Sequence, residues 1–175
     1  LSAVILLSGN DVKAADVNTS AGSAVLMEAS SGRVLYEKNA HQKQYPASIT
    51  KIMTGLLTAE NCSLDETVTF SHNSVFDLPV GSSIIGGVDE GDQYSMEFCL
   101  YGLLLLSGNE AAYAIAEHVS GNLEDFAILM NKTAKELGCL NSNFVSPNGI
   151  HDENHYTTAY DIALIAKAFF SNETL

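Results

Sequence analysis

Residues 45–57 read YPASITKIMTGLL, and the expected fold is built outward from this stretch. Most of its residues after Pro46 are apolar, and Lys51 is its only charged side chain. Ser48 and Lys51 are three residues apart, so on a helix both side chains lie on one face and can meet. The stretch therefore predicts a largely buried helix that carries a hydroxyl and an amine near its beginning.

A serine and a lysine in this position can act as a nucleophile and its base. The free N–H groups and the dipole at a helix N-terminus favour negative charge and disfavour a protonated amine. Burial also disfavours the protonated amine. To act as a general base, the lysine needs a pKa that has fallen from about 10.4 to roughly 7–8. In the alternative interpretation, Ser48 only caps the helix and Lys51 reaches solvent. Both interpretations stay open on this motif alone.

A second polar element is the triplet SGN, which occurs at residues 8–10, 107–109 and 120–122. The first copy lies in the leader, and the third looks like the end of one helix and the start of the next. The middle copy, with Ser107 and Asn109, separates two apolar segments that are expected to be buried helices. Its hydroxyl and amide then need partners inside the fold. It is either a wall of an active site or a tight interhelical turn.

The remaining pattern predicts a hairpin followed by several helices. Two strands are expected at 24–28 and 34–37, and residues 63–93 are expected to be mostly loop, with strand-like pieces at 66–70 and 82–88. Later helices are expected at 96–106, 110–119, 122–137 and 158–170, with caps at Ser95, Asn122 and Thr158. The 96–106 helix is apolar nearly all round and is expected to be buried. Two strands cannot close a sheet, so further strands are expected beyond Leu175.

Length and composition set broad limits. A chain of 175 residues with 46% hydrophobic and 17% charged residues has the composition of one globular domain. Its net charge of −13 argues against nucleic acid, because phosphates would be repelled. Residues 1–15 contain a short apolar run that resembles the remnant of a secretory signal peptide, which predicts an extracytoplasmic protein. The run is too short for a transmembrane helix.

No metal site or cofactor is expected from the sequence. The three cysteines, at 62, 99 and 139, are widely spaced and form neither a disulfide framework nor a zinc pattern. Cys99 is expected to be a small buried hydrophobe. The stretch HDENH at 151–155 has two histidines four residues apart, but it follows Pro147 and Gly149, which favours a surface loop.

The combination of motifs resembles a known family. Ser-x-x-Lys followed about sixty residues later by Ser-x-Asn is the order found in penicillin-binding proteins and class A β-lactamases. Residues 23–57, 101–122 and 130–169 resemble a serine D-alanyl-D-alanine carboxypeptidase. The resemblance implies a mixed α/β fold, with a helical subdomain and an antiparallel sheet, truncated before its later strands. Residues 16–175 would form the N-terminal part of a penicillin-recognising, transpeptidase-like catalytic domain.

The resemblance also implies roles for individual residues. Ser48 would attack the carbonyl between two D-alanines of a peptidoglycan stem peptide, and Lys51 would take its proton. Ser107 would assist proton transfer, and Asn109 would hold the substrate amide. Water would then hydrolyse the acyl-enzyme after D-alanine has left. β-Lactams would acylate the same serine, in the cell envelope of a bacterium.

Two departures from the family pattern leave alternatives open. No Lys-Thr-Gly occurs before Leu175, so this stretch alone could be inactive, and Asn148 stands where relatives often carry a histidine. A class A β-lactamase is disfavoured because Gly108 replaces the usual aspartate of its central motif. A non-catalytic wall-binding scaffold that keeps the fold is the third interpretation. The membrane anchor usual in the family is not visible in the sequence.

Overall fold

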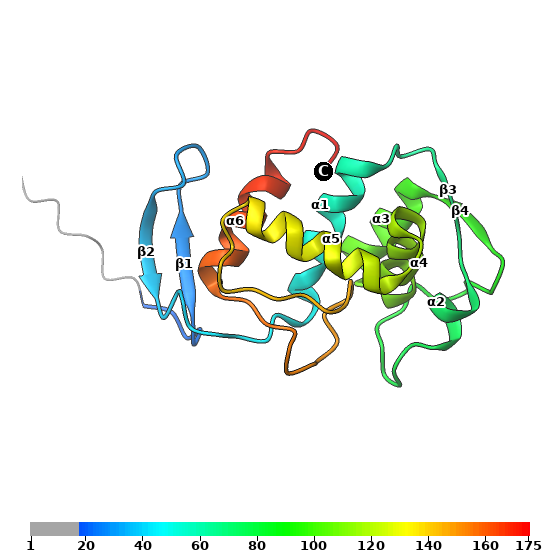
Figure 1. Cartoon of the computed structure of the whole chain (residues 1–175), viewed down its shortest axis with the longest axis horizontal. Coiled ribbons are helices and arrows are strands. Elements are labelled where there is room, and N and C mark those ends of the chain that lie inside the picture. The colour runs from blue at the N-terminus through cyan, green and yellow to red at the C-terminus, as the bar shows by residue number, and fades with distance from the viewer. Residues whose placement is uncertain (1–17) are drawn as a thin grey trace, which may run out of the picture.

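The computed structural model describes residues 18–175, and Figure 1 shows a helical body with a small two-stranded sheet at each end. The predicted leader at 1–15, and its boundary with the predicted domain, lie outside the described residues. Within 18–175, no helix is long and apolar enough to cross a membrane. The elements, in chain order, are β1 (Ala24–Met27), β2 (Val34–Lys38), η1 (Ala47–Thr50), α1 (Lys51–Asn61), β3 (Thr67–Thr69), α2 (His72–Phe76), β4 (Gln93–Ser95), α3 (Met96–Leu105), α4 (Asn109–Ser120), α5 (Leu123–Glu136) and α6 (Ala159–Phe170).

The predicted N-terminal hairpin is confirmed. β1 and β2 pair antiparallel, with Val25 opposite Glu37 and a register irregularity between Leu26 and Met27. β1 packs against α6, which joins this sheet to the helical body. The hairpin forms where the sequence alternates and then turns, since alternation gives one face that can pack and one that meets water.

The segment between α1 and α3 contains more structure than the sequence predicts. The strand-like piece at 66–70 does form β3, which pairs antiparallel with β4. The strand-like piece at 82–88 forms no strand, so that prediction is wrong. Gly86 and Gly87 have φ angles of +81° and +69°, which break an extended backbone. The short helix α2 is also missing from the prediction.

The predicted helix caps are confirmed. The side chains of Ser95, Asn122 and Thr158 each accept a hydrogen bond from the backbone N–H three residues later, at the starts of α3, α5 and α6. Gly121 ends α4 with a φ of +84°, a conformation that glycine adopts without strain. These local bonds set where the later helices begin.

The prediction that α3 is buried is only partly right. Cys99 and Leu103 on this helix are buried, but Tyr101 and Leu105 are 59% and 73% exposed. A helix that is apolar all round gives no amphipathic signal, so the sequence does not reveal which face packs inward.

Helix α4 forms the centre of the helical body. It contacts α1, α2, α3 and α5, and four of its residues belong to the core cluster that includes β3 and α3. Ala116 belongs to a second cluster with residues of α1, α5 and α6. Because alanine side chains are small, neighbouring helices can approach α4 closely. The four residues of the first cluster are Ala111, Ala112, Ala114 and Ile115.

Candidate active site

The structure brings together all four residues that the sequence singles out. Nζ of Lys51 lies 3.3 Å from Oγ of Ser48, 3.2 Å from Oγ of Ser107 and 2.7 Å from Oδ1 of Asn109. Lys51 is the first residue of α1, and Asn109 is the first residue of α4. The cluster therefore forms where the N-termini of two helices meet.

The start of the first helix differs from the simple capping interpretation. A 3-10 turn, η1, precedes α1, and Ser48 lies inside this turn rather than at its cap. Within residues 18–175, no side chain caps either η1 or α1. Lys51 is only 3% exposed, so it does not reach solvent. The alternative interpretation, in which Ser48 caps the helix and Lys51 reaches solvent, is therefore contradicted.

Burial changes the acidity of the lysine. Desolvation lowers the pKa of Lys51 from its ordinary value of 10.5 to about 8, and the nearby Glu110 carboxylate acts in the opposite direction. A lysine with a pKa near 8 has a useful neutral fraction at physiological pH. Only the neutral amine can accept a proton from a hydroxyl.

The contacts around Nζ can also accommodate a neutral amine. A fourth oxygen, the backbone carbonyl of Asn148, lies 3.2 Å from Nζ. This carbonyl and Oδ1 of Asn109 can only accept hydrogen bonds, so they engage the two N–H groups of a neutral amine. The remaining lone pair then meets Ser48 or Ser107, whose hydroxyls can donate. The arrangement can therefore take a proton from Ser48.

Two residues at the site have backbone conformations that are unusual for non-glycine residues. Ala47, directly before Ser48, has a φ of +49°, and Ser107 has a φ of +56°. Gly149 packs against the first of them: a Cβ on Gly149 would lie 1.9 Å from the carbonyl oxygen of Ala47. Such strain is characteristic of functional sites and persists only where surrounding contacts enforce it. Here the close approach of Gly149 helps to hold the turn that presents Ser48.

Buried Glu110 connects the site to the loop that follows α2. Its Oε1 accepts hydrogen bonds from the N–H groups of Ile85 and Gly86, and the N–H of Asn109 donates to the carbonyl of Ser83 at 2.8 Å. Among the described residues, Oε2 of Glu110 has no hydrogen-bond partner. These bonds hold residues 83–86 beside the start of α4.

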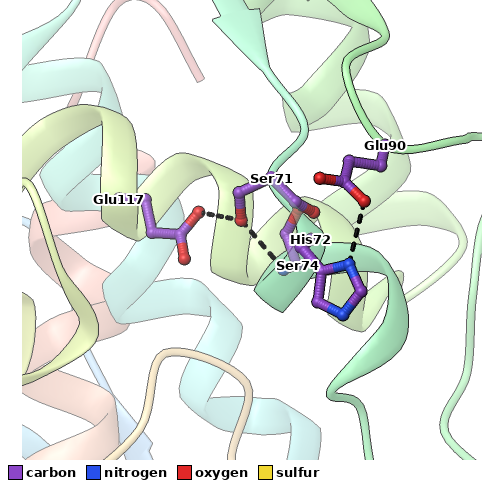
Figure 2. A network of polar contacts seen from close by, with 5 residues as sticks. All are labelled: Ser71, His72, Ser74, Glu90 and Glu117. Carbon is purple, nitrogen blue, oxygen red and sulfur yellow. Dashed lines mark hydrogen bonds and ion pairs between the residues drawn. The ribbon is translucent and has the colours of Figure 1, made fainter.

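Two side-chain contacts hold the start of α2, one to α4 and one to the end of the loop that follows α2. Figure 2 shows that Ser71, the cap of α2, contacts Glu117 of α4, with 2.6 Å between their oxygens. On the other side, Nδ1 of His72 lies 2.8 Å from Oε2 of Glu90. The pKa of His72 is raised chiefly by this bond. The first contact holds the start of α2 against α4, and the second joins Glu90, at the far end of the loop, to the start of α2.

Asn148 is a site residue whose contact the sequence does not predict. Its carbonyl contacts Lys51, and its Oδ1 accepts a hydrogen bond from the N–H of Ile150 at 3.1 Å. Its Nδ2 is buried and has no partner within the described part of the chain. A backbone carbonyl carries no signature in residue type, so no sequence motif could have identified this contact.

The prediction of a surface loop at 151–155 is wrong for its last residue. Residues 151–154 are exposed, but His155 is 1% exposed. The N–H of Val145 donates to Nδ1 of His155, so the ring proton sits on Nε2 and points to Oγ1 of Thr50 at 2.8 Å. Burial lowers the pKa of His155 to about 4. This neutral histidine anchors the residue that precedes Lys51.

Ser48 lies between two hollows in the surface. One, of about 380 Å³, is lined by Ser48, Asn109, Asn148 and residues 79–83. The other, of about 320 Å³, is lined by Ser48, Lys51, Ser107 and apolar residues of α1 and α3. A larger hollow of about 560 Å³ lies between β1 and α6 and contains none of the four predicted residues. The two hollows that share Ser48 are therefore the candidate substrate-binding sites.

Comparison with known proteins agrees with this geometry. Residues 9–174 match the peptidase family S11, described as D-alanyl-D-alanine carboxypeptidase. The chain is 40% identical over 158 residues to the D-alanyl-D-alanine carboxypeptidase DacF of Bacillus subtilis, covering 89% of this chain and 40% of that protein. It therefore spans about two-fifths of the length of that relative.

Solved structures show the same fold. The D-alanyl-D-alanine carboxypeptidase DacD from Francisella tularensis superposes with a TM-score of 0.86 at 33% identity, covering 95% of this chain and 40% of that one. Penicillin binding protein 5 from Haemophilus influenzae superposes with a TM-score of 0.83 at 33% identity, covering 90% and 47%. The predicted mixed α/β, DD-peptidase-like fold is thus confirmed. The chain belongs to the D-alanyl-D-alanine carboxypeptidase family, peptidase family S11.

Proposed function

We propose that the protein containing this chain is a serine D-alanyl-D-alanine carboxypeptidase that removes the terminal D-alanine of peptidoglycan stem peptides. The observation that carries the proposal is the buried amine of Lys51, 3.3 Å from Oγ of Ser48, with its pKa lowered to about 8. The names of the relatives and the family assignment support the substrate class. Residues 16–175 would form the N-terminal part of the catalytic domain, acting in the cell envelope.

The first chemical step uses Ser48 and Lys51. Neutral Lys51 takes the proton of the Ser48 hydroxyl as Oγ forms a bond to the carbonyl carbon of the substrate. The dipole at the start of η1 and α1 favours the negative charge that develops there. The backbone N–H of Ser48 would supply one donor to the oxyanion.

The second step expels D-alanine. Ser107, whose Oγ lies 3.2 Å from Nζ of Lys51, passes the proton to the leaving amine as the C–N bond breaks. Water then attacks the ester, with Lys51 again taking the proton, and Ser48 is regenerated. Asn109 holds Nζ through its Oδ1 and contributes to the hollow next to Ser48, where its amide can meet the substrate.

The test is acylation of the full-length protein by benzylpenicillin, followed by intact mass spectrometry. We expect one drug molecule per protein on the wild type and on the control Ser171→Ala, an exposed serine at the end of α6. We expect none on Ser48→Ala and much slower labelling of Lys51→Met. Release of D-alanine from a peptide ending in D-Ala-D-Ala should follow the same order.

Two results would contradict the proposal. A folded full-length protein that forms no adduct and releases no D-alanine would favour the non-catalytic wall-binding scaffold. Rapid turnover of benzylpenicillin without release of D-alanine from peptides would favour a β-lactamase. A lasting adduct together with D-alanine release would support the carboxypeptidase and penicillin recognition at one serine.

A further inference from the structure

A second cluster of chemically reactive side chains lies at the opposite ends of the two helices that form the active site. Cys62, Glu66 and His118 each offer one ligand atom, and these atoms all lie within 4.8 Å of one another. Nε2 of His118 is 2.9 Å from Oε2 of Glu66. The three residues come from the end of α1, the segment before β3 and the last turn of α4.

The arrangement follows from the packing of α1 and α4. Both helices begin at the active site, with Lys51 and Asn109 in contact. Both also end at this cluster, since Cys62 follows the last residue of α1 and His118 lies in the last turn of α4. The helices are 11 and 12 residues long, which places the cluster about 16 Å from Lys51. It is therefore separate from the catalytic residues.

The backbone around the cluster is already ordered. Oε1 of Glu66 accepts a hydrogen bond from the N–H of Ser63 at 2.6 Å, which leaves Oε2 directed to His118. The N–H of Cys62 donates to the carbonyl of Thr58 at 2.9 Å, which extends the end of α1. These bonds fix the Glu66 carboxylate and the backbone of Cys62.

The donor set is that of a borderline-soft divalent metal. Thiolate, imidazole and carboxylate are the three protein ligand types of Zn²⁺, with bonds of about 2.0–2.3 Å and tetrahedral geometry. Neighbouring ligand atoms in such a site are about 3.3–3.8 Å apart, so the cluster is within roughly 1 Å of the required spacing. The side chains of His118 and Glu66 are 26% and 40% exposed, so an ion can enter from solvent.

We propose that Cys62, Glu66 and His118 form a binding site for a zinc-class divalent cation that joins the C-terminal ends of α1 and α4. Water completes the coordination sphere in the open fourth position. A bound ion replaces the hydrogen bond between His118 and Glu66 and displaces the Cys62 thiol proton to solvent. The ion crosslinks α1 to α4 and so stabilises the helix pair whose other ends hold Lys51 and Asn109.

The test is metal binding by the full-length protein, with Zn²⁺ and Co²⁺ as probes. We expect one tight Zn²⁺ site per chain in competition with a chromophoric chelator, and a rise in unfolding temperature on addition of Zn²⁺. With Co²⁺ we expect a sulfur-to-cobalt charge-transfer band in the near ultraviolet. Cys99 and Cys139 are buried, so among the three cysteines only Cys62 is placed to produce this band.

The variants separate this site from other surface groups. Cys62→Ser should abolish the charge-transfer band, and His118→Gln should weaken Zn²⁺ binding by at least about tenfold, since a ligand bond is lost. Glu66→Gln keeps an acceptor for the N–H of Ser63 and tests the carboxylate without loosening that turn. The matched control is His72→Gln, which removes the histidine of the exposed pair with Glu90 and should leave binding unchanged.

Either of two results would overturn the site. One is the absence of Zn²⁺ binding to the folded wild type. The other is binding that Cys62→Ser and His118→Gln leave unchanged.

Discussion

Oδ1 of Asn109 lies 2.7 Å from Nζ of Lys51, although the two residues are 58 positions apart in the chain. This contact joins the first residue of α4 to the first residue of α1. The position of the lysine amine is therefore set by α4, and α4 in turn starts at the left-handed turn of Ser107. A change that moves the start of α4 would also move the Lys51 amine away from Ser48.

The rate of Ser48 acylation should rise with pH, with a midpoint near pH 8, because Lys51 must lose its proton to act as a base. Glu110 is the named group that raises the pKa of Lys51. Glu110→Gln should therefore move the midpoint to lower pH, while Gln can still accept from the N–H groups of residues 85 and 86. The measurement is the pH profile of benzylpenicillin acylation. Glu97→Gln, on the first turn of α3, is the control; an unchanged midpoint in Glu110→Gln would contradict the prediction.

Lys51 should also affect stability at alkaline pH. Because its pKa is lowered in the folded state, the unfolded chain binds more protons between about pH 8 and 10.5, and the free energy of unfolding rises with pH across that window. The total contribution is roughly 3 kcal/mol. Urea unfolding of wild type and Lys51→Met at pH 8 and pH 10 should show a steeper rise in the wild type. Parallel curves for the two proteins would show that Lys51 keeps an ordinary pKa.

His155 should have the corresponding effect at acid pH. Its folded pKa of about 4 lies below the ordinary value of 6.5, so its contribution to stability is complete above pH 6.5 and is lost as pH falls toward 4. Between pH 7 and pH 5 this costs about 2 kcal/mol. Chemical unfolding should reveal the loss in wild type and in the exposed control His151→Asn. In His155→Asn this loss of unfolding free energy should be absent. The same loss in His155→Asn as in the wild type would contradict the low pKa of His155.

Gly149→Ala should be strongly destabilising. Its φ of +81° disfavours alanine, and the added Cβ would overlap the carbonyl of Ala47. Gly121 has a similar φ of +84°, but no described atom lies within 4 Å of the place that a Cβ would take there. Gly121→Ala should cost about 1 kcal/mol for the conformation alone, whereas Gly149→Ala should cost about 3 kcal/mol or more and slow acylation of Ser48. Thermal unfolding measures both losses of stability. Equal losses in the two variants would show that the contact between residue 149 and Ala47 does not contribute to stability.

Local sequence chemistry determined much of the fold. Ser95, Asn122 and Thr158 each bond to a backbone N–H three residues away, so their residue types alone predict where three helices begin. The N-terminal hairpin is predicted for the same reason, because alternation and a turn act over a few residues. The spacing of Ser48 and Lys51 is also local, so their contact across one helical turn could be predicted.

Only the tertiary structure decided the chemical state and the partners of these groups. The low pKa of Lys51 depends on burial by segments far along the chain, and one of its acceptors is a backbone carbonyl at Asn148. The buried position of His155 and the meeting of Cys62 with His118 have the same origin. Residue type and spacing encode interactions over a few positions, whereas desolvation and long-range contacts exist only once the helices have packed.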